Sequence, residues 1–364
     1  MNPTSTADQT LAQLSNGLIY SAIAVNLLAF LAHCAEWAFG SRGRIARLSA
    51  TNDTKPAAAR TATKTHTDLR ADAEGGITVL TRPAAGQKTA ATPPPPTADD
   101  SAAVNDSPRA DLLGRIGIAL TTLAFLLHLG SVLSRAWSVG RPPWGNMYEF
   151  STAFALAATG TYLGLLAARK KVRWLGLPVS FSVLLTLGLA VTVLYVDSAQ
   201  LVPALDSYWL WIHVSAAIIS GGVFHTAAVA TLLYLVRDRW EHAVAEGRKQ
   251  GRLAPLWRRL PSAASLDTLS YRLNALVFPL WTFAVIAGAV WAEAAWGRYW
   301  GWDPKETWAF ITWVAYAAYL HARATAGWKG RRAAYLGLIA FAAFVFNYYG
   351  VNIFITGLHS YAGV

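Results

Sequence analysis

The chain has 364 residues, of which 54% are hydrophobic and only 14% are charged, about half the charged fraction of an ordinary soluble domain. Its net charge of +11 is also typical of proteins that bind nucleic acids. Here, however, the basic residues alternate with long apolar segments and form no single basic face, so we exclude nucleic acid as a partner.

Eight segments are long and apolar enough to cross a bilayer, because a spanning helix needs about 20 mostly apolar residues. A soluble all-α protein can bury one or two such helices but not eight. The sequence therefore predicts an all-α polytopic membrane protein. In chain order the predicted spans are 17–39, 112–136, 150–168, 175–196, 208–236, 274–295, 307–322 and 335–356.

The loops between these spans alternate in charge. Lys and Arg gather after the first, third, fifth and seventh spans, within 42–47, 169–173, 237–259 and 323–332. The positive-inside rule makes these loops cytoplasmic and predicts an N-out/C-out protein of the plasma membrane. No basic residue precedes the first span, which is the reverse of a secretory signal peptide, so we expect it to be retained.

Three regions follow from this pattern. Residues 1–39 are predicted to form an outer tail and the first span, and residues 112–364 a domain of seven spans. Between them, the segment 40–111 is rich in Ala, Thr and Pro and includes four consecutive prolines, Pro93 to Pro96. Such a composition cannot bury a core and predicts a disordered cytoplasmic linker.

The chain has one cysteine, Cys34. A single thiol forms neither an internal disulfide nor a CxxC redox pair. Any thiol chemistry that the protein supports must therefore use the cysteines of partners.

The outer loop at 296–308 has the most unusual composition in the chain. An interfacial aromatic belt explains one or two tryptophans, but four within thirteen residues, mixed with glycines and charges, favour a flat aromatic platform for a planar apolar ligand. Nearby cations would meet the acidic groups of that ligand. The candidate binding residues here are Trp296, Arg298, Trp300, Trp302, Asp303, Lys305 and Trp308.

The same loop contains a helix start. The order Asp303, Pro304, Lys305, Glu306 matches an N-cap, a proline at the first helical position and an acidic residue at the third. The two carboxylates are therefore expected to begin the seventh span, a role that does not exclude ligand contact.

Three histidines are candidate metal ligands. His213 lies about five residues inside the outer end of the fifth span, and His359 lies just beyond the outer end of the eighth, so both are expected near the tryptophan loop. His321 ends the seventh span, about 25 Å further inward. His33 and His128 lie within spans without such companions and are interpreted as structural.

Neutral imidazole binds Fe, Zn, Cu and Ni alike. No Cys, Asp or Glu cluster accompanies these histidines at metal-site spacing, which argues against a bare metal site. Two histidines, an aromatic platform and cations instead favour haem, whose iron takes axial nitrogens and whose propionates take positive charge.

The segment 296–313, WGRYWGWDPKETWAFITW, followed by Tyr319-Leu-His321, resembles the WWD motif of haem-handling proteins. More narrowly, it resembles the CcsA (ResC) family of system II cytochrome c biogenesis. The segments 146–149, 209–215, 270–272, 350–352 and 357–361 also resemble motifs of that family. The similarity extends over about 112–364.

The resemblance implies that His213 and His359 ligate haem b beneath the WWD loop on the outer face. It also implies that His321 contributes to a second, cytoplasmic-side haem site, whose other histidine comes from a ResB-like membrane subunit. Together the two proteins would act as a holocytochrome c synthase (haem lyase) that attaches haem to the CxxCH motif of apocytochrome c. Ala294 departs from the family pattern, in which a glutamate is expected, and so does the long insert after the first span.

Two other functions remain open at this point. An electron-transferring membrane b-type cytochrome would need two histidine pairs within one chain and leaves the WWD loop unexplained. A transporter of an amphipathic aromatic solute would favour internal repeats and broken spans, and the sequence shows no convincing repeat.

Overall fold

A computed structural model describes residues 8–53, 108–199, 207–249, 251 and 253–359, with only the backbone described for 41–53. All regular structure in these residues is helical. Seven of the helices are long and apolar enough to cross a membrane. The prediction of an all-α polytopic membrane protein is therefore confirmed.

The chain folds into long helices joined by short connections. Four short elements lie between or after them: η2 (Arg173–Leu175), α6 (Ala254–Trp257), the π-helix η4 (Phe346–Gly350) and α10 (Val351–Phe354). The long helices are α1 (Gln9–Asp53), α2 (Pro108–Val139), α3 (Met147–Ala167), α4 (Gly176–Thr192), α5 (Tyr208–Ala245), α7 (Ala263–Trp296), α8 (Pro304–Ala324) and α9 (Arg331–Val345).

Two boundaries differ from the sequence-based prediction. The segment 40–111 was expected to be disordered throughout, but α1 continues to Asp53 and α2 already begins at Pro108. Residues 54–107, the remainder of the predicted linker, lie outside the described residues.

Helix α8 covers the predicted span 307–322 but is less apolar than the seven candidate membrane spans. Indole, phenol and charged groups replace many of the aliphatic side chains found in those spans.

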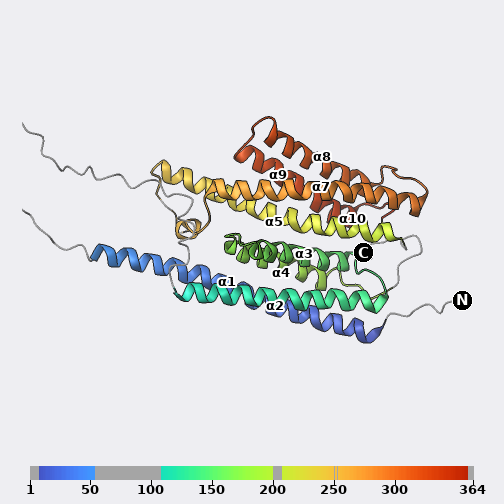
Figure 1. Ribbon diagram of the computed structural model, residues 1–364, viewed down its shortest axis with the longest axis horizontal. Coiled ribbons are helices and arrows are strands. Elements are labelled where there is room, and N and C mark those ends of the chain that lie inside the picture. The colour runs from blue at the N-terminus through green and yellow to red at the C-terminus, as the bar shows by residue number, and fades with distance from the viewer. Residues whose placement is uncertain (1–7, 54–107, 200–206, 250, 252, 360–364) are drawn as a thin grey trace, which may run out of the picture.

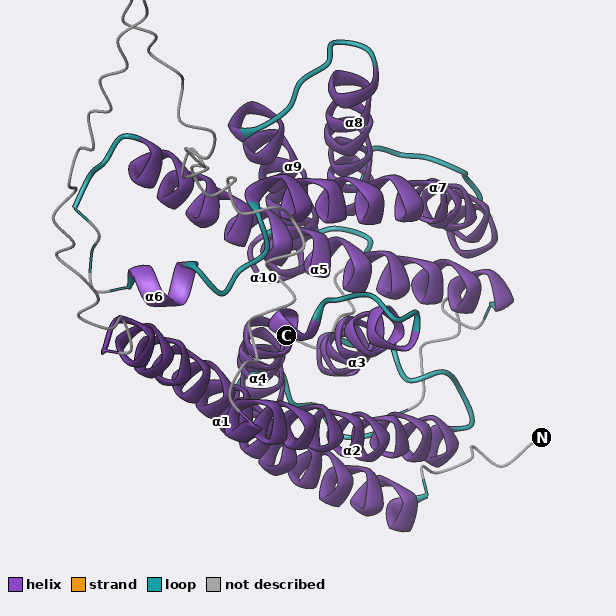
Figure 2. Ribbon diagram, turned by 60° about the vertical axis from the view of Figure 1, so that its left-hand side comes forward, coloured by secondary structure: helices purple, strands orange, loops and turns teal. Residues whose placement is uncertain are grey.

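The helices run roughly along one common axis (Figure 1). Helices α1 and α2 pack along each other on one side, α3 and α4 form the middle, and α5 packs along α7. Helices α8 and α9 complete the other side, and the view in Figure 2 separates these pairs. Because neighbouring helices are antiparallel, alternate connections lie at the same end of the bundle.

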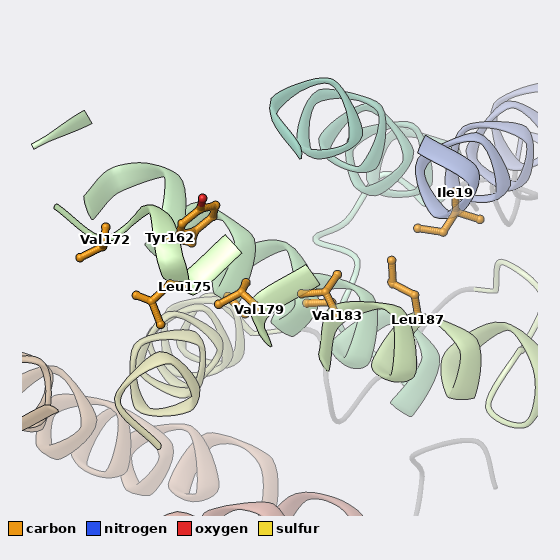
Figure 3. Packing of buried hydrophobic residues seen from close by; sticks show 9 residues of the cluster. Ile19, Tyr162, Val172, Leu175, Val179, Val183 and Leu187 are labelled. Carbon is orange, nitrogen blue, oxygen red and sulfur yellow. The ribbon is translucent and has the colours of Figure 1, made fainter. Parts of the chain in front are cut away.

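One apolar core cluster holds α1, α3 and α4 together (Figure 3). Val179, Val183 and Leu187 repeat every four residues and so form one buried stripe of α4, as expected for a helix that packs through one face. They meet Tyr162 of α3 and Ile19 of α1, which are fully buried. The core fixes the middle of the bundle, against which α5 and the site helices pack.

The two ends of the bundle differ in the residues they carry. The basic connections at 168–172, 246–249, 258–262 and 325–330 lie at one end, on the left in Figure 1. The starts of α3, α5 and α8 and the loop 297–303 lie at the other end, which we call the pocket end.

Candidate functional site

A cavity lies at the pocket end between α3, α5, α7, α8 and the α9–η4–α10 segment. It contains about 1180 Å³ of space free of protein atoms, a figure that includes space open to solvent. Most of its wall is apolar. The polar residues that line it are Asn146, His213, Lys305, Glu306, Asn347, Asn352 and His359.

His213 borders the cavity from the second turn of α5. Its Nδ1 donates a hydrogen bond of 2.7 Å to the main-chain oxygen of Ala284 on α7, which leaves the ring lone pair on Nε2. Gly288, one turn further along α7, lets the ring approach so closely, because a Cβ there would lie 2.7 Å from Cε1 of His213. The two helices thus fix both the tautomer and the position of this imidazole.

His359 borders the same cavity from the segment that follows α10. Its Nδ1 donates a hydrogen bond of 2.8 Å to Oδ2 of Asp303, so this imidazole too carries its lone pair on Nε2. A histidine whose Nδ1–H bonds a carboxylate is the usual arrangement around protein-bound metals, where the carboxylate orients the ring and raises its basicity.

Trp291 of α7 connects the two histidines. Its ring lies nearly parallel to that of His213, with centroids 6.2 Å apart, and edge-on to that of His359 at 5.6 Å. Trp296 also contacts His359, at 4.9 Å. The structure thus brings the two predicted ligands together around indole rings. In the described part of the chain no group of three or more His, Cys, Asp or Glu side chains is placed to hold a bare metal ion.

The four tryptophans of the loop do not form one flat platform. Trp296 and Trp300 line the cavity. Trp302 points outward, is 65% exposed and makes an angle of 90° with Trp300. Trp308 packs against Phe346, 4.3 Å away. The chain turns sharply through this loop, with Gly297 and Trp302 both at positive φ, and so neighbouring indoles face different directions.

Asp303 organises the start of α8 and the end of the chain at once. Its carboxylate accepts hydrogen bonds from the main-chain N–H of Lys305 and from that of Leu358, and Glu306 completes the capping box. The predicted helix start is confirmed. Burial alone would raise the pKa of Asp303, but the hydrogen bonds from His359 and Leu358 outweigh it and lower this pKa to about 2. The carboxylate beside His359 is therefore charged.

The two predicted cations have different positions. Lys305 lines the cavity, and its Nζ donates a hydrogen bond of 3.0 Å to the main-chain oxygen of Asn347. Arg298 lies over Gly301, with Nη1 3.8 Å from Glu306, and is not part of the cavity wall.

His321 lies in the last turn of α8, away from the cavity. It is exposed on the surface of the bundle, and its Nδ1 lies 3.4 Å from Oγ1 of Thr325. The structure therefore separates it from His213 and His359, as the helix length required.

The loop 140–147 forms a cavity wall that the sequence reasoning did not assign. Trp144 and Asn146 line the cavity. The buried carboxylate of Glu149 holds this loop, because it accepts hydrogen bonds from Arg135, from Arg141 and from the main-chain N–H of Gly145. The similarity of 146–149 to a family motif was the available signal, but it did not indicate a ligand-facing wall.

Sequence reasoning also missed Trp281, Trp291 and Asn347, all of which line the cavity. Trp281 lies in the middle of its predicted span, where an interfacial anchor is not expected, and this position was a usable signal. Asn347 lies in the π-helix η4, a feature that is common at functional sites but leaves no mark in hydropathy.

Comparison with known proteins identifies the family. Residues 144–359 match the family described as cytochrome C assembly protein. A cytochrome c biogenesis protein CcsA from Porphyra purpurea is 36% identical over 286 residues, covering 70% of this chain and 89% of that protein. The CcsA of Gloeobacter violaceus is 34% identical over 298 residues, covering 70% of this chain and 88% of its own length.

The matched region includes the whole cavity wall from Trp144 to His359. The chain belongs to the cytochrome c assembly family, and its similarity is to the CcsA-type members.

Proposed function

We propose that this protein acts in cytochrome c biogenesis by binding haem b in the cavity and presenting it to apocytochrome c. The observation that carries the proposal is the pair of imidazoles, His213 and His359, on one aromatic cavity. Each donates its Nδ1–H to a protein acceptor, so that the ring lone pair is on Nε2, the nitrogen through which such a histidine binds a metal. Cytochrome c assembly is the process named for the family and for its CcsA relatives.

In this proposal haem is the cargo of the protein, and the two histidines are its axial ligands. Trp291 and Trp296, which contact the imidazoles, would pack beside the macrocycle. Attachment adds the thiol S–H of each CxxCH cysteine across a haem vinyl C=C, so each thioether forms without an added oxidant. A thiol-reducing, thioredoxin-like protein would keep those cysteines reduced.

Release requires that one axial ligand yield to the histidine of CxxCH. His213 is fixed within the long helix α5, whereas His359 lies on the non-helical segment after α10 and is oriented by Asp303. We assign His359 as the ligand that exchanges, because displacing it disturbs no helix packing.

The basic loops support the orientation. They lie opposite the cavity, and by the positive-inside rule we assign the cavity and the loop 296–308 to the outer face of the plasma membrane. His321, exposed near the basic end, would meet a ResB-like membrane subunit there and form the inner haem site with it. Exposed ionisable groups on membrane helices are costly unless they meet such a partner.

The test is the absorption spectrum of the detergent-purified protein, co-expressed with a ResB-like subunit. We expect a bis-imidazole b-type spectrum from the wild type. His213→Ala and His359→Ala are each expected to lower the haem content or shift the spectrum, and added imidazole is expected to restore it. His128→Ala is the matched control, since His128 is also buried within a span but does not line the cavity.

Unchanged spectra in both variants would refute the ligand assignment. A haem that never transfers to a CxxCH peptide supplied with thiol would instead favour the electron-transferring cytochrome.

A further inference from the structure

Lys305 has fewer partners than its charge requires. An ammonium group has three N–H donors, yet Nζ of Lys305 has one hydrogen-bond acceptor, the main-chain oxygen of Asn347. Among the described residues no carboxylate oxygen lies within 4.0 Å of Nζ, the limit for an ion pair. The phenol ring of Tyr348, whose centroid is 5.5 Å away, covers one side of Nζ. Burial lowers the pKa of Lys305 to about 7 although the charge of Asp303 opposes this, so an anion beside its remaining donors on the cavity wall would stabilise the charged form.

The π-helix η4 builds the rest of this wall. Its wider turn pairs the N–H of Val351 with the oxygen of Phe346, five residues earlier, so the main-chain oxygen of Asn347 is available to Lys305. The Asn347 side chain is 93% buried, lines the cavity, and its amide oxygen has no hydrogen-bond partner. Buried amides are rarely left unpaired. A 180° flip of the Asn347 side-chain amide exchanges its oxygen and nitrogen, and the NH₂ group at the unpaired position can then donate to a ligand.

The same cavity contains a third unpaired donor, on α7. Phe344 is one turn before Asn347, and its ring contacts that of Trp281 at 5.5 Å. Trp281 is buried, lines the cavity, and its indole N–H has no acceptor in the protein. An indole N–H is a donor only, so its complement on a ligand is an acceptor.

One acidic group lies on the same cavity. Glu306 directs Oε2 to the main-chain N–H groups of Gly301 and Asp303, while its Oε1 has no partner. Consecutive residues on a helix point about 100° apart, and so Glu306 and Lys305 present opposite charges to different parts of the cavity.

We propose that Lys305, Asn347 and Trp281 form a carboxylate-binding subsite that fixes one acidic edge of the ligand and thereby sets its rotation in the cavity. This inference rests on the proposed function, for which the ligand is haem, whose two propionates occupy one edge of the ring. The opposite, uncharged edge then faces away from η4. The subsite distinguishes ligands by charge at one edge, whereas the two histidines act on the iron alone.

The experiment compares two ligands that differ only in this charge. Iron protoporphyrin IX and its dimethyl ester are titrated into the full-length protein in detergent, in complex with its ResB-like subunit, and binding is followed by absorption. We expect the wild type to bind the diacid about tenfold more tightly than the ester, since charge-assisted hydrogen bonds are the stronger class. Lys305→Met is expected to weaken diacid binding by about that factor and to leave ester binding unchanged.

Three variants make the result specific. Trp281→Phe removes only an N–H and is expected to cause a smaller loss, again confined to the diacid. Asn347→Leu removes both amide groups and should act in the same direction. Arg298→Met is the matched control, because Arg298 lies on the same loop outside the cavity wall, and its diacid-to-ester ratio should equal that of the wild type. Ratios cancel the different partitioning of the two ligands into detergent.

The ester also separates the two hypotheses. Equal binding of diacid and ester by the wild type, or equal losses of both in Lys305→Met, overturns the subsite while the haem site stands. Failure of the wild type to bind either ligand overturns the proposed function and the subsite with it. Ester binding that is retained in Lys305→Met shows that this variant is folded.

Discussion

Two clusters of buried polar groups lie at opposite ends of the bundle, and they differ in how completely the protein itself satisfies them. The cluster far from the cavity joins α1, α2 and η2. His33, which is fully buried, lies 3.4 Å from Glu36, and Arg173 is 2.9 Å from Glu36 and 2.9 Å from Asp111. Each charged group in this cluster has an opposite charge within the protein.

Small residues make the close packing of this cluster possible. A Cβ added to Gly117 would lie 2.7 Å from the ring of His33, and one added to Gly176 would lie 2.5 Å from it. Because these two glycines have no side chain, the His33 ring packs directly against the backbones of α2 and α4.

The cavity differs from this cluster, in which Nε of Arg173 lacks a hydrogen bond but still pairs with the Glu36 carboxylate at 2.9 Å. It contains empty space, and its wall includes buried polar atoms of Trp281, Trp291, Glu306 and Asn347 that have no protein partner. Buried polar groups in native proteins are nearly always satisfied. The comparison therefore separates a polar cluster that stabilises the fold from one that awaits a ligand, although both contain a histidine beside a carboxylate.

The largest effect that would sharpen this comparison is expected at Glu36. Glu36→Ala leaves Arg173 and His33 without their shared carboxylate, and breaking a buried ion pair in this way costs about 3 kcal/mol or more of unfolding free energy. The thermal midpoint in detergent should fall, while the haem content of the protein that stays folded should not change.

Asp111→Ala provides the graded control for that variant. Its side chain is 39% exposed, so a smaller loss, below about 1 kcal/mol, is expected. If fully folded Glu36→Ala protein contains less haem than the wild type, the cluster far from the cavity takes part in ligand binding and the contrast between the two clusters is wrong.

The next effect is expected at Gly288. Gly288→Ala places a Cβ 2.7 Å from Cε1 of His213 and 2.8 Å from its Nδ1, which must displace the imidazole or separate α5 from α7. Overpacking of this kind costs about 2 kcal/mol, and haem binding should weaken with it. Haem titration and thermal stability measure the two consequences separately.

Gly188→Ala is the matched control, because nothing lies within 4 Å of a Cβ at that position on α4. It should bind haem as the wild type does. If Gly288→Ala also retains full binding, His213 is not held in the position that the cavity requires.

A smaller effect is expected at Asp303. Asn in its place keeps a good N-cap and an oxygen for the N–H of Leu358 but removes the charge beside His359. Loss of such a partner lowers metal affinity about tenfold, which a haem titration detects.

The pH dependence of the same variant checks the charge. The pKa of Asp303 falls from the usual 3.8 to about 2, so its carboxylate stabilises the fold fully above pH 4 and loses this effect as the pH falls through 2. Asp303→Asn should lack this acid-dependent part of the stability. An identical acid profile in both proteins would contradict the hydrogen bond from His359 to a charged Asp303.

Much of the fold could be predicted from sequence because its signals are local. Twenty apolar residues make a membrane helix wherever they occur, and the order Asp303 to Glu306 defines a helix start by itself. The end of α1 was missed because residues 40–53 lack an apolar stripe, and helix can continue on backbone hydrogen bonds that hydropathy does not register.

The site was predicted only in part because its geometry is not local. Charge and position brought His213 and His359 to one end of the bundle. The directions of the four indoles, however, depend on positive-φ residues such as Trp302. The hydrogen bond from Nδ1 of His213 to the main-chain oxygen of Ala284 depends on how α5 and α7 cross. Asn347 could not be found at all from sequence, since its role follows from a π-helix.

The smallest effect is expected at Trp302, which has a positive φ of 58° and a side chain that is 65% exposed. A left-handed backbone conformation costs a bulky residue about 1 kcal/mol. Glycine removes that cost, but it loses more chain entropy on folding, which destabilises the protein by a similar amount. Trp302→Gly should therefore change stability by less than about 1 kcal/mol and leave haem affinity unchanged. Trp296→Ala, which opens the cavity wall beside His359, should weaken binding.

A tryptophan kept at a strained position and turned away from the cavity suggests a role after haem is bound. If the yield of thioether falls in Trp302→Gly while haem affinity does not, the outward indole serves contact with apocytochrome c. If affinity falls as much as in Trp296→Ala, Trp302 belongs to the cavity in solution, and the division of the loop into inward and outward tryptophans is wrong.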